Sequence, residues 1–423
     1  MVKIDGKLHK VVGIVVECNP FHKGHIRLLE ECKNKGDFIV AIMSGNYVQR
    51  GEASVYDKYK RANELLKHGV SLIIELPIEY VLSSAKFFAG ASVQILNNLG
   101  FIDYLIFGSK INDIDELNRI AAINIDEDSD KLNNSIGTIK NNGNNIKSKI
   151  KCLLKEGKSY AASISKIISE NTDKKLTPND ILAVEYIRAI NMTGSKIEPL
   201  TIKRKNDLPT ASALREKIKK KITCDSFSDI LNYKLLLAKN SKELNGCSNL
   251  SSIYLMTEDM ENAILNSISL NNNISFTKRA MALKTKNLTL AYIKRLFFNI
   301  IFNIKKVDVA PIYEEVKGTK SKGSINNGIK NFKKNNYIRI LGFNKICSSL
   351  LKKIKIPMLM SFAPSSYKDF ISKYKKPSVI KNKKGEYILS PILRKNIFAS
   401  DLYYHLSDEK FCESKRQIVT ISL

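Results

Sequence analysis

The first 110 residues alternate between short apolar runs and segments of helical periodicity, and this alternation constrains the fold more than any other feature of the chain. Runs rich in β-branched residues, each closed by a turn-forming residue, predict buried strands, whereas apolar residues three or four apart predict helices. The predicted strands are Val11–Val16, Phe38–Met43, Leu72–Leu76 and Tyr104–Phe107, and the predicted helices are Gly24–Lys33, Tyr56–His68 and Ser84–Leu99. This order predicts an α/β fold with a Rossmann-like parallel sheet and right-handed crossovers.

Three polar loops follow the predicted strands directly. They are Glu17–His25, Ser44–Gly51 and the pair Gly108-Ser109. Ligands of parallel sheets bind beyond the carboxyl ends of the strands. We therefore expect these loops to form one site.

The rest of the chain is predicted to be mostly helical. Thr177 and Pro178 provide an N-cap and a first position for one helix, and Leu200–Ile202 is predicted to return as a strand. Residues 317–334 are rich in Gly, Lys, Ser and Asn and predict a mobile basic loop. The predicted domains are residues 1–225, with a helical insertion at about 111–200, and a basic, mostly helical domain at 226–423.

Positive charge is concentrated in the second part of the chain. The formal net charge is +28, from 69 basic and 41 acidic residues. Residues 1–125 carry 15 basic and 14 acidic residues, so 54 basic and 27 acidic residues follow them. A near-neutral domain followed by a basic one predicts a catalytic domain joined to a domain that binds a polyanion such as a nucleic acid. The alternative is a lysine-rich surface that is merely solvated.

The cysteines and the apolar segments argue for a cytoplasmic protein. Seven scattered cysteines without a C-x-x-C pair make a disulfide framework or a zinc site an unfavoured interpretation. No stretch at the start has the layout of a signal peptide. The apolar segment Leu296–Ile304 is too short to cross a bilayer and contains two asparagines.

The strongest local signal is the motif His22-Lys23-Gly24-His25, between a predicted strand and a predicted helix. Gly24 allows a phosphate to approach the backbone, and the start of a helix offers unpaired N–H groups. The two histidines stand one helical turn apart, so both rings can face one anion. Such a His-x-Gly-His loop resembles the phosphate-binding element of the nucleotidyltransferase superfamily, where the histidines stabilise charge on the α-phosphate. The alternative is one capping histidine and one core histidine.

A second element, Thr210–Arg215, resembles the helix start that holds the leaving phosphates in the same superfamily. Ser212 can cap this helix, and Arg215 lies one turn inside it. Helix caps followed by arginine are common, so this element indicates a phosphate site only when it is combined with His22 and His25.

The whole chain resembles the bacterial tRNA(Met) cytidine acetate ligase family. Matching segments occur in order along nearly the full length. They are Val15–His25, Met43–Glu52, Glu75–Pro77, Phe107–Ser109, Asn179–Tyr186, Ile202–Arg204, Ser212–Arg215, Ile293–Leu296, Leu341–Phe343 and Ala399–Tyr403.

This resemblance implies a two-step reaction with ATP as a substrate. The enzyme converts acetate to acetyl-adenylate and then acetylates the exocyclic amine of the wobble cytidine of elongator tRNA(Met). The histidines implied in catalysis are His22 and His25. The residues implied in ATP binding are Val15, Val16, Glu17, Cys18, Asn19, Pro20, Phe21, His22, Lys23, Gly24, His25, Ile26, Arg27, Leu28, Gly108, Asn179, Arg204, Ser212 and Arg215. Mg²⁺ is expected with ATP because of the phosphate charge, and no protein metal site is identified.

The sequence departs from the family pattern at three places. Cys18 stands where an aromatic residue is common, and Lys86 replaces a frequent acidic residue. The loop Lys205–Asp207 replaces a glycine-containing turn. None of these changes removes a phosphate ligand.

A further set of residues is predicted to contact a substrate, with a solvated loop as the alternative for Gln49–Glu52. They are Ser44, Asn46, Gln49, Arg50, Lys58 and Arg61. Asp57, Lys58 and Arg61 on the next helix could hold the acetyl-adenylate or the acceptor base of the tRNA, and pairing of the three with one another is an equally open alternative.

Three other functions are less well supported. A small-molecule adenylyltransferase shares both phosphate elements but needs no basic C-terminal part. A non-catalytic RNA-binding protein on the same fold would be expected to lose the phosphate ligands. An aminoacyl-tRNA synthetase would carry a Lys-Met-Ser-Lys-Ser type of loop, which this sequence lacks.

Overall fold

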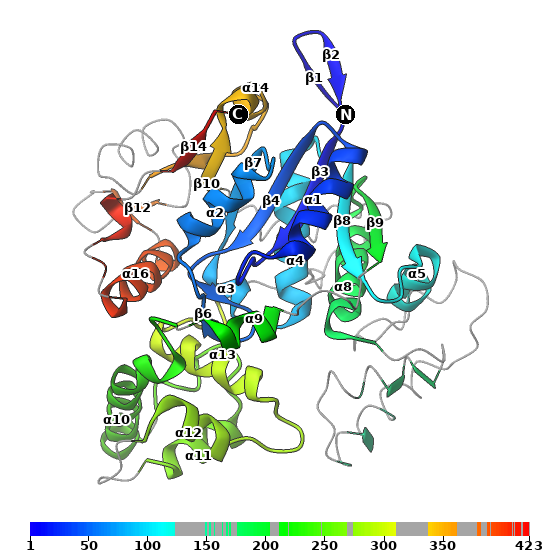
Figure 1. The fold of residues 1–423 in the computed structure, drawn as a ribbon. Helices are drawn as coiled ribbons and strands as arrows, with labels where there is room; N and C mark the ends of the chain where they lie inside the picture. Colours follow the sequence, from blue (N-terminus) through cyan, green and yellow to red (C-terminus); the bar gives the residue numbers. More distant parts are fainter. Residues whose placement is uncertain are drawn as a thin grey trace, which may run out of the picture.

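The structure is a computed structural model, and its ribbon is drawn in Figure 1. It describes residues 1–122, 176–203, 211–268, 274–309, 337–361 and 391–422, apart from the single residues 219, 247, 408, 410, 416 and 417. It also describes isolated residues between 149 and 170 and two short strands at 379–381 and 387–389. The predicted basic loop at 317–334 lies outside the described residues, as does most of the stretch 123–175 within the predicted helical insertion.

The centre of the fold is a parallel sheet, as the alternation predicts. Its strands are β3 (Val11–Val16), β4 (Phe38–Ser44), β7 (Leu72–Leu76), β8 (Tyr104–Ser109) and β9 (Glu198–Lys203). They pair in the order β7-β4-β3-β8-β9, all parallel. The strand order reverses between β3 and β8, and the crevice at such a switch point is the usual ligand site of an open α/β sheet.

Helices cover both faces of this sheet (Figure 1). They are α1 (Lys23–Lys35), α2 (Lys58–Lys67), α3 (Ile78–Val81), α4 (Ala85–Leu99), α5 (Ile114–Ala122) and α8 (Pro178–Thr193). Helix α4 packs against α8 and against the middle of β3. At Gly13 of β3 a Cβ atom would lie 2.9 Å from the Cδ1 atom of Leu96, so this glycine allows the close approach of α4.

A helical body lies at the carboxyl ends of the strands (Figure 1). It contains η1 (Cys224–Phe227), α10 (Ser228–Asn245), α11 (Glu258–Asn266), α12 (Phe276–Ala282) and α13 (Leu290–Ile301). Its core is aromatic: the ring of Phe298 contacts those of Phe227 and Phe276, and Tyr47 of the sheet domain packs against Phe227 and Phe298. The helical body and the sheet therefore share a core.

The last described part of the chain returns to the sheet, which differs from the predicted separate domain at 226–423. Strand β10 (Ile338–Asn344) pairs antiparallel with β7, and β11 (Met358–Leu359) and β14 (Val419–Ile421) pair parallel with β10. This pairing covers β7, which would otherwise be an exposed edge of the parallel sheet. Helix α16 (Pro391–Leu406) packs on α3.

The remaining elements are short. They are the hairpin β1 (Val2–Ile4) and β2 (Lys7–His9), the hairpin β5 (Tyr47–Val48) and β6 (Glu52–Ala53), α9 (Ala211–Lys217), η4 (Lys345–Cys347), α14 (Ser348–Leu351), the pair β12 (Val379–Lys381) and β13 (Tyr387–Leu389), and η5 (Glu413–Lys415). Within the described part of the chain, no helix combines the length and apolar character needed to cross a membrane.

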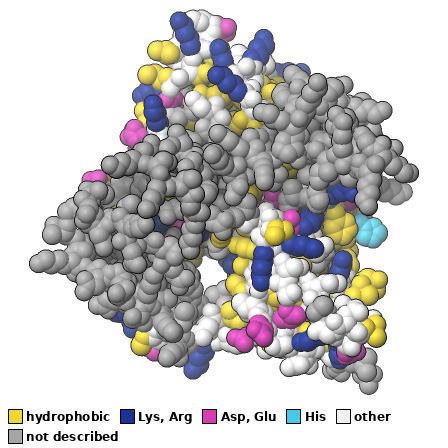
Figure 2. All heavy atoms as spheres, turned by 180° about the vertical axis from the view of Figure 1, so that it is seen from behind, with side chains coloured by type: hydrophobic (Ala, Val, Ile, Leu, Met, Phe, Trp, Pro, Cys, Tyr) yellow, Lys and Arg dark blue, Asp and Glu magenta, His cyan; other side chains and the backbone are white. Residues whose placement is uncertain are grey.

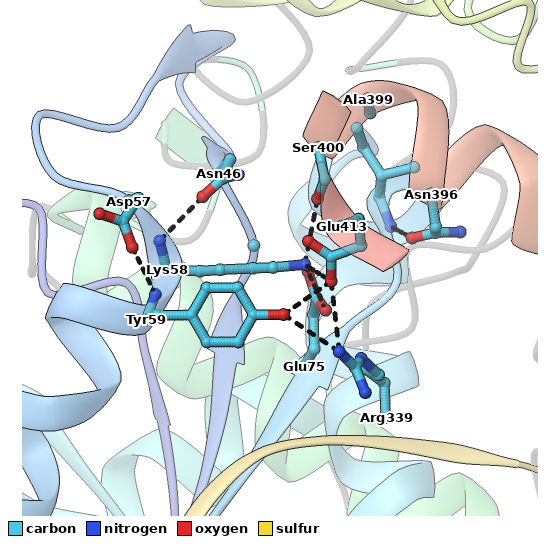
Figure 3. Close-up of polar contacts among 12 residues, drawn as sticks. Asn46, Asp57, Lys58, Tyr59, Glu75, Arg339, Asn396, Ala399, Ser400 and Glu413 are labelled. Carbon is cyan, nitrogen blue, oxygen red and sulfur yellow. Dashed lines mark hydrogen bonds and ion pairs between the residues drawn. The ribbon is translucent and has the colours of Figure 1, made fainter. Parts of the chain in front are cut away.

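A buried ionic cluster holds the C-terminal segment on the sheet (Figure 3). The ammonium of Lys58 lies 2.9 Å from the carboxylate of Glu75 and 2.8 Å from that of Glu413. Arg339 of β10 lies 3.3 Å from Glu413, and the Tyr59 hydroxyl donates to the same carboxylate at 2.9 Å. Burial would raise the pKa of Glu413, but Lys58 and Arg339 outweigh it and hold the pKa below its ordinary value.

We expect Glu413→Gln to lower the free energy of unfolding by about 3–5 kcal/mol at pH 7, because two buried cations lose their shared anion. Urea denaturation measures this change, with Glu30→Gln on the exposed face of α1 as the matched control. A carboxylate with a lowered folded pKa stabilises the protein above its unfolded pKa. The difference between wild type and variant should therefore shrink as the pH falls below 4.5, the ordinary value. A constant difference down to acid pH would contradict this account.

Candidate nucleotide site

The His-x-Gly-His motif forms the start of α1, directly after β3. His22 is the N-cap, and its Nδ1 atom accepts a hydrogen bond of 3.0 Å from the backbone N–H of Gly24. The Nδ1 atom of His25 accepts one of 3.2 Å from the backbone N–H of His22. The two rings lie with their centroids 4.0 Å apart, and the ring of Phe21 stacks on His25 at 5.5 Å. Each histidine is therefore held by the backbone of the loop in which it stands.

These hydrogen bonds assign the tautomer of both histidines. An Nδ1 atom that accepts from a backbone N–H carries no proton, so a neutral ring carries its proton on Nε2. Both residues are only partly buried. Two Nε2–H donors on adjacent rings suit an anion such as a phosphate oxygen.

The second predicted phosphate element lies against this loop, although 196 residues separate the two positions in contact. Arg215 of α9 donates to the backbone carbonyl of Asn19 at 2.7 Å and to the hydroxyl of Ser212 at 2.9 Å. The structure thus brings Ser212 and Arg215 to the histidine motif. Arg204 and the loop Lys205–Asp207 lie outside the described residues.

The end of β8 and the start of α8 meet on the other side of the crevice. Asp180 accepts hydrogen bonds from the Ser109 hydroxyl at 2.7 Å and from the Lys110 backbone at 2.8 Å. It also completes a capping box with Thr177. Burial would raise the pKa of Asp180, but these hydrogen bonds outweigh it and lower the pKa. These hydrogen bonds of Asp180 hold the end of β8, which contains Gly108, beside the helix turn that contains Asn179.

Glu17 connects the histidine loop to the loop that follows β4. Its carboxylate accepts a hydrogen bond of 2.7 Å from the backbone N–H of Gln49. Burial raises the pKa of Glu17, against the opposing effects of the Gln49 N–H and of the Arg61, Arg50 and Arg215 charges. Of the other residues implied in ATP binding, Val15 and Val16 end β3, and Ile26, Arg27 and Leu28 lie half-buried in the first turns of α1.

Arg61 and Lys58 have partners within the protein, but these partners come from other segments and differ from the mutual pairing with Asp57 that the sequence left open. Arg61 is 1% exposed and donates to the backbone carbonyls of Glu17 at 2.6 Å, of Tyr56 at 3.0 Å and of Gly45. Lys58 is 1% exposed and belongs to the ionic cluster of Figure 3. These contacts tie three loops together, and direct substrate contact by either residue stays a prediction.

Ser44 and Asn46 lie buried at the end of β4. Asn46 accepts a hydrogen bond of 2.8 Å from the backbone of Lys58, and its carbonyl accepts one of 3.1 Å from Ser54. Among the described residues, neither its Nδ2 atom nor the Ser44 hydroxyl has a hydrogen-bond partner. Asn46 borders a cavity of about 10 Å³, which also touches Glu75, Asn396 and Ser400 and has room for about one water molecule.

Sequence reasoning missed the residues that join this site to the helical body. Arg295 of α13 donates to the backbone carbonyl of Gln49 at 3.0 Å. Lys294 lies 2.9 Å from the carboxylate of Glu52, and Lys220 lies 3.7 Å from it. The sequence did mark both segments as important, because Met43–Glu52 and Ile293–Leu296 each resemble the family. Their contact could not be read from the sequence, since the two segments are far apart in the chain.

The fold and this site together define a HIGH nucleotidyltransferase. Two overlapping stretches, residues 9–219 and 207–417, match the family model described as HIGH Nucleotidyl Transferase.

The chain belongs to the tRNA(Met) cytidine acetate ligase family, which confirms the resemblance seen in the sequence. It is 31% identical over 440 residues to the tRNA(Met) cytidine acetate ligase of Thermoanaerobacter sp. (strain X514), covering 93% of this chain and 94% of the relative. It is 34% identical over 392 residues to that of Clostridium novyi (strain NT), covering 83% and 89%.

A solved structure confirms the predicted α/β fold. The crystal structure of Thermotoga maritima TmcAL bound with alpha-thio ATP matches with a TM-score of 0.73 at 24% identity. The match covers 98% of this chain and all of the other.

Proposed function

We propose that this protein activates acetate with ATP and acetylates the wobble cytidine of elongator tRNA(Met), forming N4-acetylcytidine. The observation that carries the proposal is the 2.7 Å contact between Arg215 and Asn19, which joins two phosphate-binding elements from distant parts of the chain. Membership of the ligase family, over nearly the whole length, supports the particular substrates.

The first step forms acetyl-adenylate. An oxygen of acetate attacks the α-phosphorus of ATP, the bond between that phosphorus and the bridging oxygen breaks, and pyrophosphate leaves with the electron pair. The Nε2–H groups of His22 and His25 stabilise the charge that builds on the α-phosphate. Arg215 binds the leaving pyrophosphate, since a guanidinium forms paired hydrogen bonds with phosphate oxygens.

The second step transfers the acetyl group. The exocyclic amine of cytidine is a weak nucleophile because its lone pair is delocalised into the ring. It attacks the carbonyl carbon of the mixed anhydride, the bond to the AMP oxygen breaks, AMP leaves and the amine loses a proton. The enzyme must therefore hold the anhydride in place and keep water from it.

Mg²⁺ is expected to enter with ATP and to neutralise phosphate charge. Among the residues that the structure describes, no cluster of three or more His, Cys, Asp or Glu side chains could hold a metal ion. The proposal names no protein ligand for this ion.

The basic part of the chain supplies the surface for tRNA. The 54 basic and 27 acidic residues after residue 125 favour contact with a polyphosphate backbone. On the described part of the face in Figure 2, Lys and Arg side chains are scattered among hydrophobic and acidic ones. A tRNA substrate also supports the expected cytoplasmic location.

Analysis of nucleosides by mass spectrometry tests this function. Unmodified tRNA(Met) is incubated with the protein, ATP and isotopically labelled acetate and is then digested. We expect labelled N4-acetylcytidine that requires both ATP and acetate. Dinucleotide or coenzyme-precursor products without acetylcytidine would instead identify a small-molecule adenylyltransferase.

We expect the acetyl group never to be bound covalently to the enzyme. Burial raises the pKa of the Cys18 thiol to about 12, so this cysteine of the ATP loop is not a thiolate at neutral pH. Cys18→Ala should retain acetyl transfer to tRNA within about tenfold, a loss of at most about 1.4 kcal/mol.

The measurement is acetyl transfer from labelled acetate, followed by a search for protein-bound label. Recovery of acetyl-AMP from enzyme without tRNA would agree with direct transfer from the adenylate. Label attached to the wild-type protein but absent from Cys18→Ala would show that the cysteine carries the acetyl group.

A further inference from the structure

We propose that Arg50, at the tip of the hairpin formed by β5 and β6, binds the leaving pyrophosphate together with Arg215. This inference rests on the proposed function, because it assigns a residue to the leaving group of the first step. Arg50 is exposed, and the structure gives it no carboxylate within ion-pair distance among the described residues.

The residue before Arg50 is fixed from two sides. The backbone N–H of Gln49 donates to the carboxylate of Glu17 at 2.7 Å, which ties the hairpin to the histidine loop. The backbone carbonyl of Gln49 accepts a hydrogen bond of 3.0 Å from Arg295 of the helical body. Both backbone groups of Gln49 are therefore engaged, one by each part of the molecule.

The residue after Arg50 is fixed by close packing. Gly51 has a φ of +72°, and a Cβ atom there would lie 2.7 Å from the backbone nitrogen of Arg295. Only glycine combines this conformation with this approach. Because Gln49 and Gly51 are both held, the backbone position of Arg50 is set and its side chain remains at the surface.

Arg50 and Arg215 are both positively charged, and the segments that carry them both contact the histidine loop. Arg215 is held by the carbonyl of Asn19, two residues from Glu17, to which the Arg50 hairpin is tied. Burial lowers the pKa of Arg215, and the positive charge of Arg50 lowers it further. Two cations of like charge near one loop are stabilised when an anion binds between them.

Pyrophosphate suits this pair better than acetate does. It carries several negative charges and enough oxygens to accept bidentate hydrogen bonds from two guanidiniums, whereas acetate offers one charge and two oxygens. His22 and His25 lie on the same loop as Asn19 and are assigned to the α-phosphate. A cation pair beside this loop would therefore meet the β- and γ-phosphates of ATP.

The test compares Arg50→Gln and Arg50→Lys with Arg119→Gln, an exposed arginine of α5 that pairs with Glu116. The readouts are formation of acetyl-AMP without tRNA, inhibition by inorganic pyrophosphate, and inhibition by AMP. For Arg50→Gln we expect a loss on the order of tenfold to a hundredfold in acetyl-AMP formation and in the affinity for pyrophosphate. Inhibition of Arg50→Gln by AMP should change little. The activity and pyrophosphate affinity of Arg50→Lys should lie between those of wild type and Arg50→Gln. Arg119→Gln should resemble wild type.

Two further measurements separate this inference from its alternatives. Acetyl transfer to tRNA from added acetyl-AMP should be retained in Arg50→Gln, because no pyrophosphate leaves in that step. Weaker tRNA binding with unchanged pyrophosphate affinity would assign Arg50 to the RNA and overturn the inference, as would unchanged behaviour in every assay. If the wild-type protein forms no acetyl-AMP but Arg50→Gln still loses affinity for pyrophosphate, the proposed function fails and the pyrophosphate assignment stands.

Discussion

Replacing either histidine of the loop should lower the rate of acetyl-adenylate formation about a hundredfold or more, corresponding to about 3 kcal/mol of lost transition-state stabilisation. The variants are His22→Ala and His25→Ala, and the assay measures pyrophosphate release without tRNA. The reason is that each ring, with Nδ1 accepting from the backbone, presents an Nε2–H donor. Removal of that donor leaves the charge on the α-phosphate less stabilised.

The structure also shows that His22 caps α1, so alanine at this position removes a cap worth about 1 kcal/mol. His22→Asn separates the two effects, because asparagine is a good N-cap but lacks the imidazole donor. We expect the Asn variant to unfold like wild type and to remain as slow as His22→Ala. His405→Ala, at an exposed position of α16, is the matched control. Wild-type rates in His22→Asn would mean that the histidine serves only as a cap.

Salt should affect the two half-reactions very differently. Binding of tRNA(Met) to the basic part of the chain should weaken by about a thousandfold between 50 and 200 mM salt if six phosphates are contacted. The cause is the release of counterions from the RNA backbone when lysines replace them. Filter binding or fluorescence anisotropy over this range measures the slope directly.

Formation of acetyl-AMP without tRNA is the internal control for the salt experiment. It depends on the histidine loop of the near-neutral part of the chain and on Arg215, which contacts that loop, and it involves no RNA backbone. We therefore expect its rate to change little over the same range. Parallel salt curves for binding and for adenylate formation would contradict the separation of chemistry from RNA contact.

Local sequence patterns were enough to predict the central sheet. The runs Val11–Val16 and Leu72–Leu76 are strands with those same bounds, and the run from Phe38 extends by one residue to Ser44. The start of α8 at Pro178 also agrees, with Thr177 as its cap. Such features depend on residues within a few positions, so one sequence contains the information for them.

The pairing of the C-terminal segment with the sheet was not predicted, although Ile338–Asn344 contains the apolar residues Ile338, Ile340 and Leu341. Its antiparallel pairing with β7 joins positions more than 250 residues apart, for example Arg339 with Glu75. Periodicity indicates that a segment is extended, but it carries no information about which edge the segment joins. The lysine-rich surroundings favoured a helical domain instead.

The sequence by itself determined the α/β class, the loops at the strand ends and the residue types suited to a phosphate, because these follow from local periodicity and motif spacing. Only the tertiary structure decided which residues meet. It placed Arg215 on Asn19, joined Arg295 to Gln49, and directed Arg61 and Lys58 to partners inside the protein. A side chain's role depends on the neighbours that folding brings to it, and for buried charges the cost of desolvation makes those neighbours decisive.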